Sequence, residues 1–321
     1  MAALPLLVEP QREAAPGMAD VARRLADLLS QESSQRPDVR AFQPTSPPPR
    51  VAAVDGSSVI LAESGSHLIG AFRAAGVFVE RGQVRPIERN APEVCLLSHA
   101  DAAAALSLRL GGRDVAPLPP KACLDALRSH TESALALRLV EQLDAGDALL
   151  LDGSLAVRPP VLLLDEVLKR AAERRVDVIG VCKSTSMTIG AAPAIAVCQL
   201  AARDFPTATW SVEVKAPPNV RGRVLVARLS RAEERPFRFD VNAAEGDPVV
   251  VLARLCGLAG HPAYPGYPSP LAMAHHAAVI AEDERRHLAM TVMDRVCALG
   301  VRGDAWRAAF VDYHEVLELG V

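Results

Sequence analysis

Two short apolar runs end in the same three residues, and each supplies an aspartate that could bind a metal ion. The runs are 51-VAAVDGSSV-59 and 148-ALLLDGSLA-156, which we interpret as buried strands that give way to tight turns at Asp-Gly-Ser. A buried carboxylate is costly unless a cation meets it. If the strands are neighbours, Asp55 and Asp152 face one point and offer the hard oxygen ligands that Mg²⁺ or Mn²⁺ prefers. The alternative is a pair of ordinary Asp-Gly turns.

Two further charged residues could join this pair. Glu132 lies on the apolar stripe of a helix predicted over 121–144, where it needs a partner, either a metal ion or Arg128 one turn earlier. Lys183 ends the apolar run 178-VIGVCKST-185 at the position equivalent to the two aspartates, so it could bind a scissile phosphate or offset the acids. The plainer interpretations are a Glu132–Arg128 pair on a solvated edge and a strand-end lysine in solvent.

The segment 264-YPGYPSPLAMAHH-276 contains a tyrosine and a histidine suited to phosphate chemistry. Its prolines predict a stiff, extended loop before a helix that starts after Pro270, which places Tyr267 and His275 at one end of the domain. Tyr267 could donate a hydrogen bond to phosphate, and His275 could orient water, protonate a leaving group or bind metal. A core histidine is the alternative, and His276 is expected to face solvent.

The hydrophobic pattern predicts a mixed α/β fold that positions these residues. Strands are expected at 51–61, 67–82 with a glycine break, and 93–98, as an antiparallel meander. The helix at 121–144, the strand ending at Asp152, the helix 161–175 and the strand 176–185 indicate a parallel βαβ crossover. Further strands are predicted at 208–214, 222–229 and 236–241, with helices from 271 to 319. Residues 1–50 are interpreted as an arm with a helix at 18–31 and a proline-rich linker without regular structure, and 51–321 as one domain.

Composition narrows the classes of function. The chain has 321 residues, half of them apolar, and a net charge of −3, so nucleic-acid contact must come from a local basic patch or from metal ions. Aromatic residues make up 4%, which argues against stacking platforms along a single strand. Six cysteines without CxxC spacing argue against a zinc site or disulfides. No signal peptide or membrane span is apparent, so we expect a cytoplasmic protein.

Taken in order, Asp55 in VDGSS, a helical Glu132, Asp152 in LLDGSL, Lys183 in GVCKST, and Tyr267 with His275 in GYPSPLAMAH resemble the NurA nuclease family. The resemblance runs from about Val51 to about Arg286. It implies an RNase H-like core and a manganese-dependent nuclease that acts 5′ to 3′ on DNA ends and as an endonuclease on single strands. It also implies a toroidal homodimer that works with the hexameric HerA translocase, a ring ATPase, in end resection during double-strand-break repair.

By position, the resemblance matches Asp55, Glu132 and Asp152 to the metal-binding acids of the family, and Tyr267 and His275 to its active-site tyrosine and histidine. Our hypothesis is a two-metal phosphodiesterase that uses Mn²⁺, with Mg²⁺ as the other candidate ion. Lys183, Tyr267 and His275 would handle the phosphate and the leaving group. The alternatives are an RNA-directed nuclease or phosphatase on the same scaffold, and an inactive adaptor of a ring ATPase.

Overall fold

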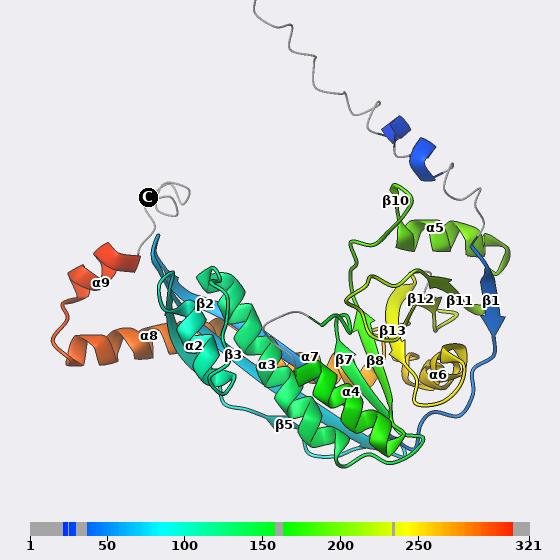
Figure 1. Cartoon of the computed structure of the whole chain (residues 1–321), viewed down its shortest axis with the longest axis horizontal. Coiled ribbons are helices and arrows are strands. Elements are labelled where there is room, and N and C mark those ends of the chain that lie inside the picture. The colour runs from blue at the N-terminus through cyan, green and yellow to red at the C-terminus, as the bar shows by residue number, and fades with distance from the viewer. Residues whose placement is uncertain (1–21, 25, 30–36, 158–162, 233–234, 311–321) are drawn as a thin grey trace, which may run out of the picture.

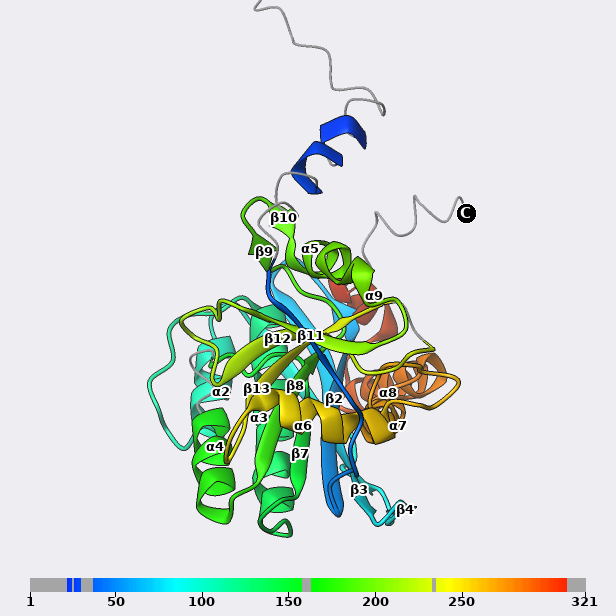
Figure 2. The same cartoon turned by 90° about the vertical axis from the view of Figure 1, so that its right-hand side faces the viewer.

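A large mixed β-sheet forms the centre of the molecule, and helices cover both of its faces (Figures 1 and 2). The computed structural model describes residues 22–24, 26–29, 37–157, 163–232 and 235–310. Within these residues the main sheet has 11 strands in the order β1-β11-β12-β13-β8-β7-β2-β3-β4, with β5 and β6 also paired to β3. The predicted α/β class, a mixed sheet flanked by helices, is confirmed.

The sheet region that carries the candidate residues consists of an antiparallel meander followed by two parallel strands. Its elements are β2 (Arg50–Glu63), β3 (His67–Glu80), β6 (Glu93–Ser98), α3 (Pro120–Val140), β7 (Ala148–Asp152), α4 (Leu163–Arg174) and β8 (Asp177–Cys182). The strands β2, β3 and β6 form an antiparallel meander, while β7 lies parallel to β2 and β8 parallel to β7. Helices α3 and α4 make the crossovers into β7 and β8. The meander and the parallel crossover therefore form as predicted, except that β3 continues through its glycines without a break.

The remaining strands extend the sheet beyond β8. They are β13 (Phe237–Asn242), β12 (Arg223–Arg228), β11 (Thr209–Val214) and β1 (Val39–Phe42), all antiparallel to their neighbours. The expectation that 32–50 lacks regular structure was wrong at β1. The run Val39–Phe42 contains no proline, and β11 supplies the hydrogen-bonding edge that it needs. Short strands also form: β4 (Gln83–Val84) and β5 (Glu88–Arg89) in the main sheet, and β9 (Thr188–Ile189) with β10 (Ala192–Pro193) as a separate pair.

Alternate residues of β2 face opposite sides of the sheet, as the period of a strand requires. Ala52 and Val54 pack with Leu135 of α3, whereas Val51 and Ala53 share a core with Leu271 of α7. The α3 face is covered by α2 (Ala102–Arg109), α3 and α4, and the opposite face by α6 (Pro248–Leu255), α7 (Ser269–Ala278) and α8 (Glu282–Ala298). The chain also forms α5 (Ala194–Ala201) and α9 (Gly303–Phe310).

The predicted N-terminal helix and the predicted C-terminal helices agree with the structure where they are described. Residues 22–24 and 26–29 are helical, and helices continue from α7 to Phe310. The rest of the 18–31 helix and residues 311–319 lie outside the described residues. The domain boundary predicted at residue 50 stays a prediction. Strand β1, which lies before that boundary, pairs with β11 of the main sheet. In the described part of the chain, no helix has both the length and the apolar content to cross a membrane.

Candidate active site

The two aspartates lie next to each other on neighbouring parallel strands. Val54 of β2 is the register partner of Leu151 of β7, and each is followed directly by its aspartate. Both side chains share the sheet face covered by α7, because they alternate with residues that pack toward α3. Asp152 is the last residue of β7, and Gly153 begins the predicted turn with φ of +87°. Asp55 differs from the prediction because it lies inside β2, which continues in register with β3.

Lys183 places its ammonium where the two carboxylates converge. It follows the last residue of β8, and its Nζ lies 3.5 Å from Asp55 Oδ2 and 3.0 Å from Asp152 Oδ1. The lysine side chain is 41% exposed, whereas that of Asp55 is 2% exposed. The cation therefore reaches from solvent into a buried acidic pocket. It offsets two like charges that would otherwise repel each other.

His275 and Tyr267 complete the cluster from the α7 side. The Nδ1 atom of His275 lies 2.6 Å from Asp55 Oδ2, and the Tyr267 hydroxyl donates to Asp152 Oδ1 at 3.0 Å. Burial, and then the charge of Asp152, raise the pKa of Tyr267, so its hydroxyl keeps the proton that it donates. The loop before α7 was predicted to be extended, but it is wound into tight turns, with Tyr267 N donating to Tyr264 O. As predicted, His276 is exposed.

The buried Asp55 carboxyl is held between opposing electrostatic effects. Burial raises its pKa most, and the nearby Asp152 charge raises it further, while Lys183 and His275 lower it. Its Oδ1 accepts a hydrogen bond from Gly56 N at 2.7 Å. A carboxylate with so little solvent depends on the cations and donors around it, and this dependence makes it a candidate functional group.

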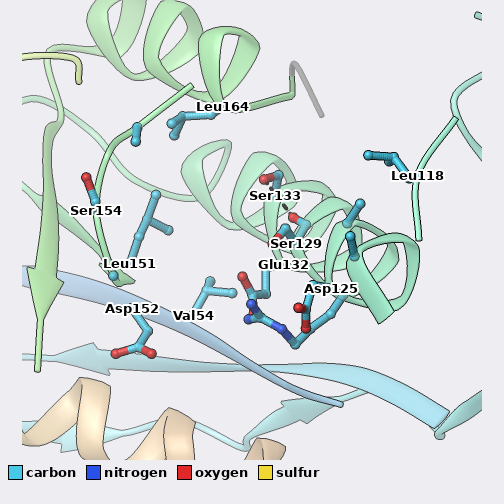
Figure 3. Close-up of a pocket in the computed structure, with 15 residues that line it drawn as sticks. Val54, Leu118, Asp125, Ser129, Glu132, Ser133, Leu151, Asp152, Ser154 and Leu164 are labelled. Carbon is cyan, nitrogen blue, oxygen red and sulfur yellow. Dashed lines mark hydrogen bonds and ion pairs between the residues drawn. The ribbon is translucent and has the colours of Figure 1, made fainter. Parts of the chain in front are cut away.

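Glu132 does not join this cluster directly, because it lies on the opposite face of β2. Figure 3 shows Glu132 and Asp152 on either side of the strand that contains Val54. Gly56 faces α3, and a Cβ atom there would overlap the Glu132 carboxylate, so the absence of a side chain lets the glutamate touch the strand. Glu132 forms the predicted alternative, an ion pair with Arg128. Burial raises its pKa to about 7 against the lowering effect of Arg128, and Asp55 and Asp152 add to the rise.

A cavity of about 570 Å³ opens on this second face (Figure 3). Arg128, Ser129 and Glu132 of α3 line one side, and Asp152 and Ser154 at the end of β7 line another. The cavity thus joins the glutamate to the strand end that carries Asp152. The acids belong to one electrostatic system, since the charges of Asp55 and Asp152 act on Glu132 through β2.

Sequence analysis missed a buried network that holds the turn after Asp152. Asp240 of β13 is fully buried and accepts from Ser154 Oγ at 2.6 Å and from Leu155 N at 2.9 Å. Arg238, two residues earlier, donates to both Asp240 oxygens and to Ser154 Oγ. It also donates to Thr185 Oγ1 at 3.3 Å, in the loop that follows Lys183. The signal was available in 236-PFRFDV-241, where two opposite charges alternate with apolar residues on one face of a strand.

The side chains of this cluster supply only part of the oxygen ligands that a hard divalent cation needs. Two carboxylates converge on one point, which Lys183 Nζ marks as a place where positive charge is stabilised. In the described part of the chain, no group of three His, Cys, Asp or Glu side chains is arranged to hold a metal ion. Glu132 is kept from the group by β2 and by Arg128. Asp55 and Asp152 are therefore the residues that could hold a cation in this arrangement.

Comparison with known proteins identifies the family and the solved structures that this chain resembles. The NurA domain model matches residues 49–280. The fold is similar to a crystal structure of the NurA nuclease from Sulfolobus solfataricus, with a TM-score of 0.62 and 17% identity over 89% of this chain and 96% of the other. A NurA structure with manganese matches with a TM-score of 0.57 and 13% identity, over 90% of this chain and 100% of the other. A search of the curated proteins found no match. With the family model covering most of its length and both predicted aspartates side by side in the sheet, the chain belongs to the NurA nuclease family.

Proposed function

We propose that this protein is a metal-dependent DNA nuclease that uses Mn²⁺ or Mg²⁺, with Asp55 and Asp152 as its central cation ligands. The observation that carries the proposal is the convergence of these two carboxylates on a single cationic point. The manganese in a related NurA structure supports the choice of ion. When bound, such an ion would polarise the phosphodiester and lower the pKa of water. His275 is proposed as an additional ligand. Glu132, which β2 separates from Asp55, is proposed as a ligand through the cavity that it lines together with Asp152, and the number of ions is proposed to be two.

The chain's own residues divide the remaining tasks. Tyr267 stays protonated and fixes one oxygen of Asp152, so that carboxylate keeps its orientation. An ionised Asp55 can only accept hydrogen bonds, so it favours the proton on Nδ1 of His275 and leaves Nε2 as an acceptor. With its side chain 44% exposed, His275 can exchange a proton with water or a leaving group. Lys183, drawn away from the acids, would bind a phosphate oxygen.

The proposed polarity, substrate form and partners rest on membership of the NurA family. We propose 5′ to 3′ exonuclease action on DNA ends, endonuclease action on single strands, and a role in end resection for double-strand-break repair. The proposed partners are DNA, a second copy of this chain in a homodimer, and a HerA-type hexameric ATPase. Light scattering of the purified chain tests the dimer, and co-elution with the ATPase tests the partnership.

Cleavage of end-labelled oligonucleotides tests the central proposal. Single-stranded DNA, duplex DNA and RNA of one sequence are incubated with Mn²⁺, Mg²⁺ or chelator, using wild type, Asp55→Asn and Asp152→Asn. Asp204→Asn is the matched control, since its side chain is 70% exposed. We expect DNA cleavage only with metal, in wild type and the control. Cleavage of RNA alone would identify an RNA nuclease, and uncut substrates would favour an adaptor.

A further inference from the structure

A row of four rings leads from the Asp55 carboxylate to the surface. His275, which contacts Asp55, has its ring centroid 5.8 Å from that of His276. His276 is 5.4 Å from Tyr264, and Tyr264 stacks on His261 at 5.6 Å with an interplanar angle of 23°. The Tyr264 hydroxyl hydrogen-bonds His276 Nε2. Beyond His275, all three rings are exposed.

The sequence between α6 and α7 builds this row. Tyr264, Pro265, Gly266 and Tyr267 form a tight turn in which Tyr267 N donates to Tyr264 O at 3.1 Å. Gly266 has φ of +79° at the third position and proline occupies the second, which is the pattern of a type II turn. The turn sends Tyr267 inward to Asp152, where it is 7% exposed, and leaves Tyr264 outside at 37%.

A second turn adds the outermost ring. Tyr264 N donates to His261 O at 3.0 Å, which brings the His261 ring over the tyrosine. Pro262 and Pro265 fix backbone angles on both sides of Tyr264. The rings are therefore held in place before any ligand arrives. A preorganised surface loses little conformational entropy when it binds.

We propose that His276, Tyr264 and His261 form a stacking site for an unpaired nucleobase next to the scissile phosphate. The proposal rests on the nuclease function proposed above and adds the form of DNA that the site takes. Every base has a π-face that can stack on an aromatic ring, but bases in an intact duplex cover these faces with one another. A base that reaches the row must come from a single strand or a frayed end.

Charge and position agree with this assignment. Lys183 Nζ lies 3.3 Å from His275 Nδ1, so a cation for phosphate stands at the inner end of the row. Each step between ring centres is 5.4 to 5.8 Å. A stacked strand advances about 3.4 Å per nucleotide, so the exposed rings lie within a few nucleotides of a phosphate at Asp55. The low aromatic content argued against platforms along a strand, yet the fold gathers one platform beside the acids.

The test combines Tyr264 variants with a base deletion in the substrate. Single-stranded oligonucleotides carry one abasic residue, moved by one nucleotide at a time relative to the cleaved bond. We expect Tyr264→Ala and Tyr264→Leu to raise KM on the intact strand about 5- to 150-fold with little change in kcat, which corresponds to the loss of one stacked base. Tyr264→Trp should restore binding. At one abasic position, the KM of wild type should rise to the KM of Tyr264→Ala.

Two measurements separate the possible failures. Fluorescence anisotropy with the Asp152→Asn variant reports base-dependent binding even if the protein cuts no DNA, so the stacking site is tested apart from catalysis. Leu108→Ala, at a leucine that is 83% exposed on α2, is the matched control and should leave KM unchanged. Equal KM values for wild type and Tyr264→Leu would overturn the proposal, as would equal effects of the abasic residue at every position.

Discussion

Replacing Glu132 by glutamine should stabilise the protein at alkaline pH. Burial raises the pKa of this carboxyl from its ordinary value of 4.5 to about 7, so the folded state binds more protons than the unfolded state between these values. The stability that comes from the protonated carboxyl is complete below pH 4.5 and is lost as the pH rises through 7. At about 1.4 kcal/mol per pH unit, ionising the buried group costs about 3 kcal/mol.

Partial exposure reduces this figure. The side chains of Glu132 and Arg128 are 17% and 28% exposed, so solvent screens part of the cost. We therefore expect Glu132→Gln to raise the free energy of unfolding by about 1 to 3 kcal/mol at pH 8. The advantage should shrink as the pH falls toward 5. Urea unfolding of both proteins between pH 5 and 8.5, in the presence of chelator, measures the difference.

An exposed glutamate supplies the control. Glu282 forms an ion pair with Arg286 four residues later, but its side chain is 54% exposed and its arginine partners lower its pKa to about 2. Glu282→Gln should therefore give no stabilisation at any pH in this range. If Glu132→Gln is as stable as wild type or less stable at pH 8, the carboxyl bears no cost of burial, and the electrostatic account of the α3 face is refuted.

Three other perturbations test the packing around the site. Gly56→Ala should destabilise the fold by about 1 to 3 kcal/mol, because the new methyl group overlaps Glu132. The control is Gly65→Ala, which has open space around the new methyl group and should change stability by less than about 0.5 kcal/mol. Asp240→Asn should cost about 3 kcal/mol in urea unfolding, since it leaves Arg238 buried without its carboxylate, and wild-type stability would contradict the network. Lys183→Met should enlarge the rise in melting temperature that saturating Mn²⁺ produces, because the ion no longer competes with an ammonium. An equal rise in the variant and in wild type would exclude that competition.

The sequence predicted the residues at strand ends better than those inside strands. Asp152 and Lys183 follow apolar runs, and the structure places both at the ends of neighbouring parallel strands. Asp55 has the same local sequence but lies inside β2, because pairing with β3 extends the strand well past Gly56. Local turn preference is weak compared with a long antiparallel ladder. Only the partner strand, which is remote information, distinguishes the two Asp-Gly-Ser runs.

Two other features depend on contacts that periodicity does not contain. The apolar stripe of α3 indicated that Glu132 faces the sheet, but it could not show that α3 and α7 cover opposite faces. The turn after Asp152 is held by Asp240, 88 residues later in the chain and two strands away in the sheet. Alternation predicts which residues of a strand share a face, but it does not identify the strand beside it.

The arrangement of cations explains how such an acidic site can fold before it meets a metal ion. Lys183 offsets part of the charge of Asp55 and Asp152 on the α7 face, and Arg128 pairs with Glu132 on the α3 face. Each acid thus has a cation from its own chain, unlike the ligands of a zinc finger, which need the metal for the fold itself. Chelator should therefore leave the structure folded. If a divalent ion binds as proposed, it would have to displace Lys183 from the aspartates, and the displaced ammonium would lie beside the position where a phosphate would enter.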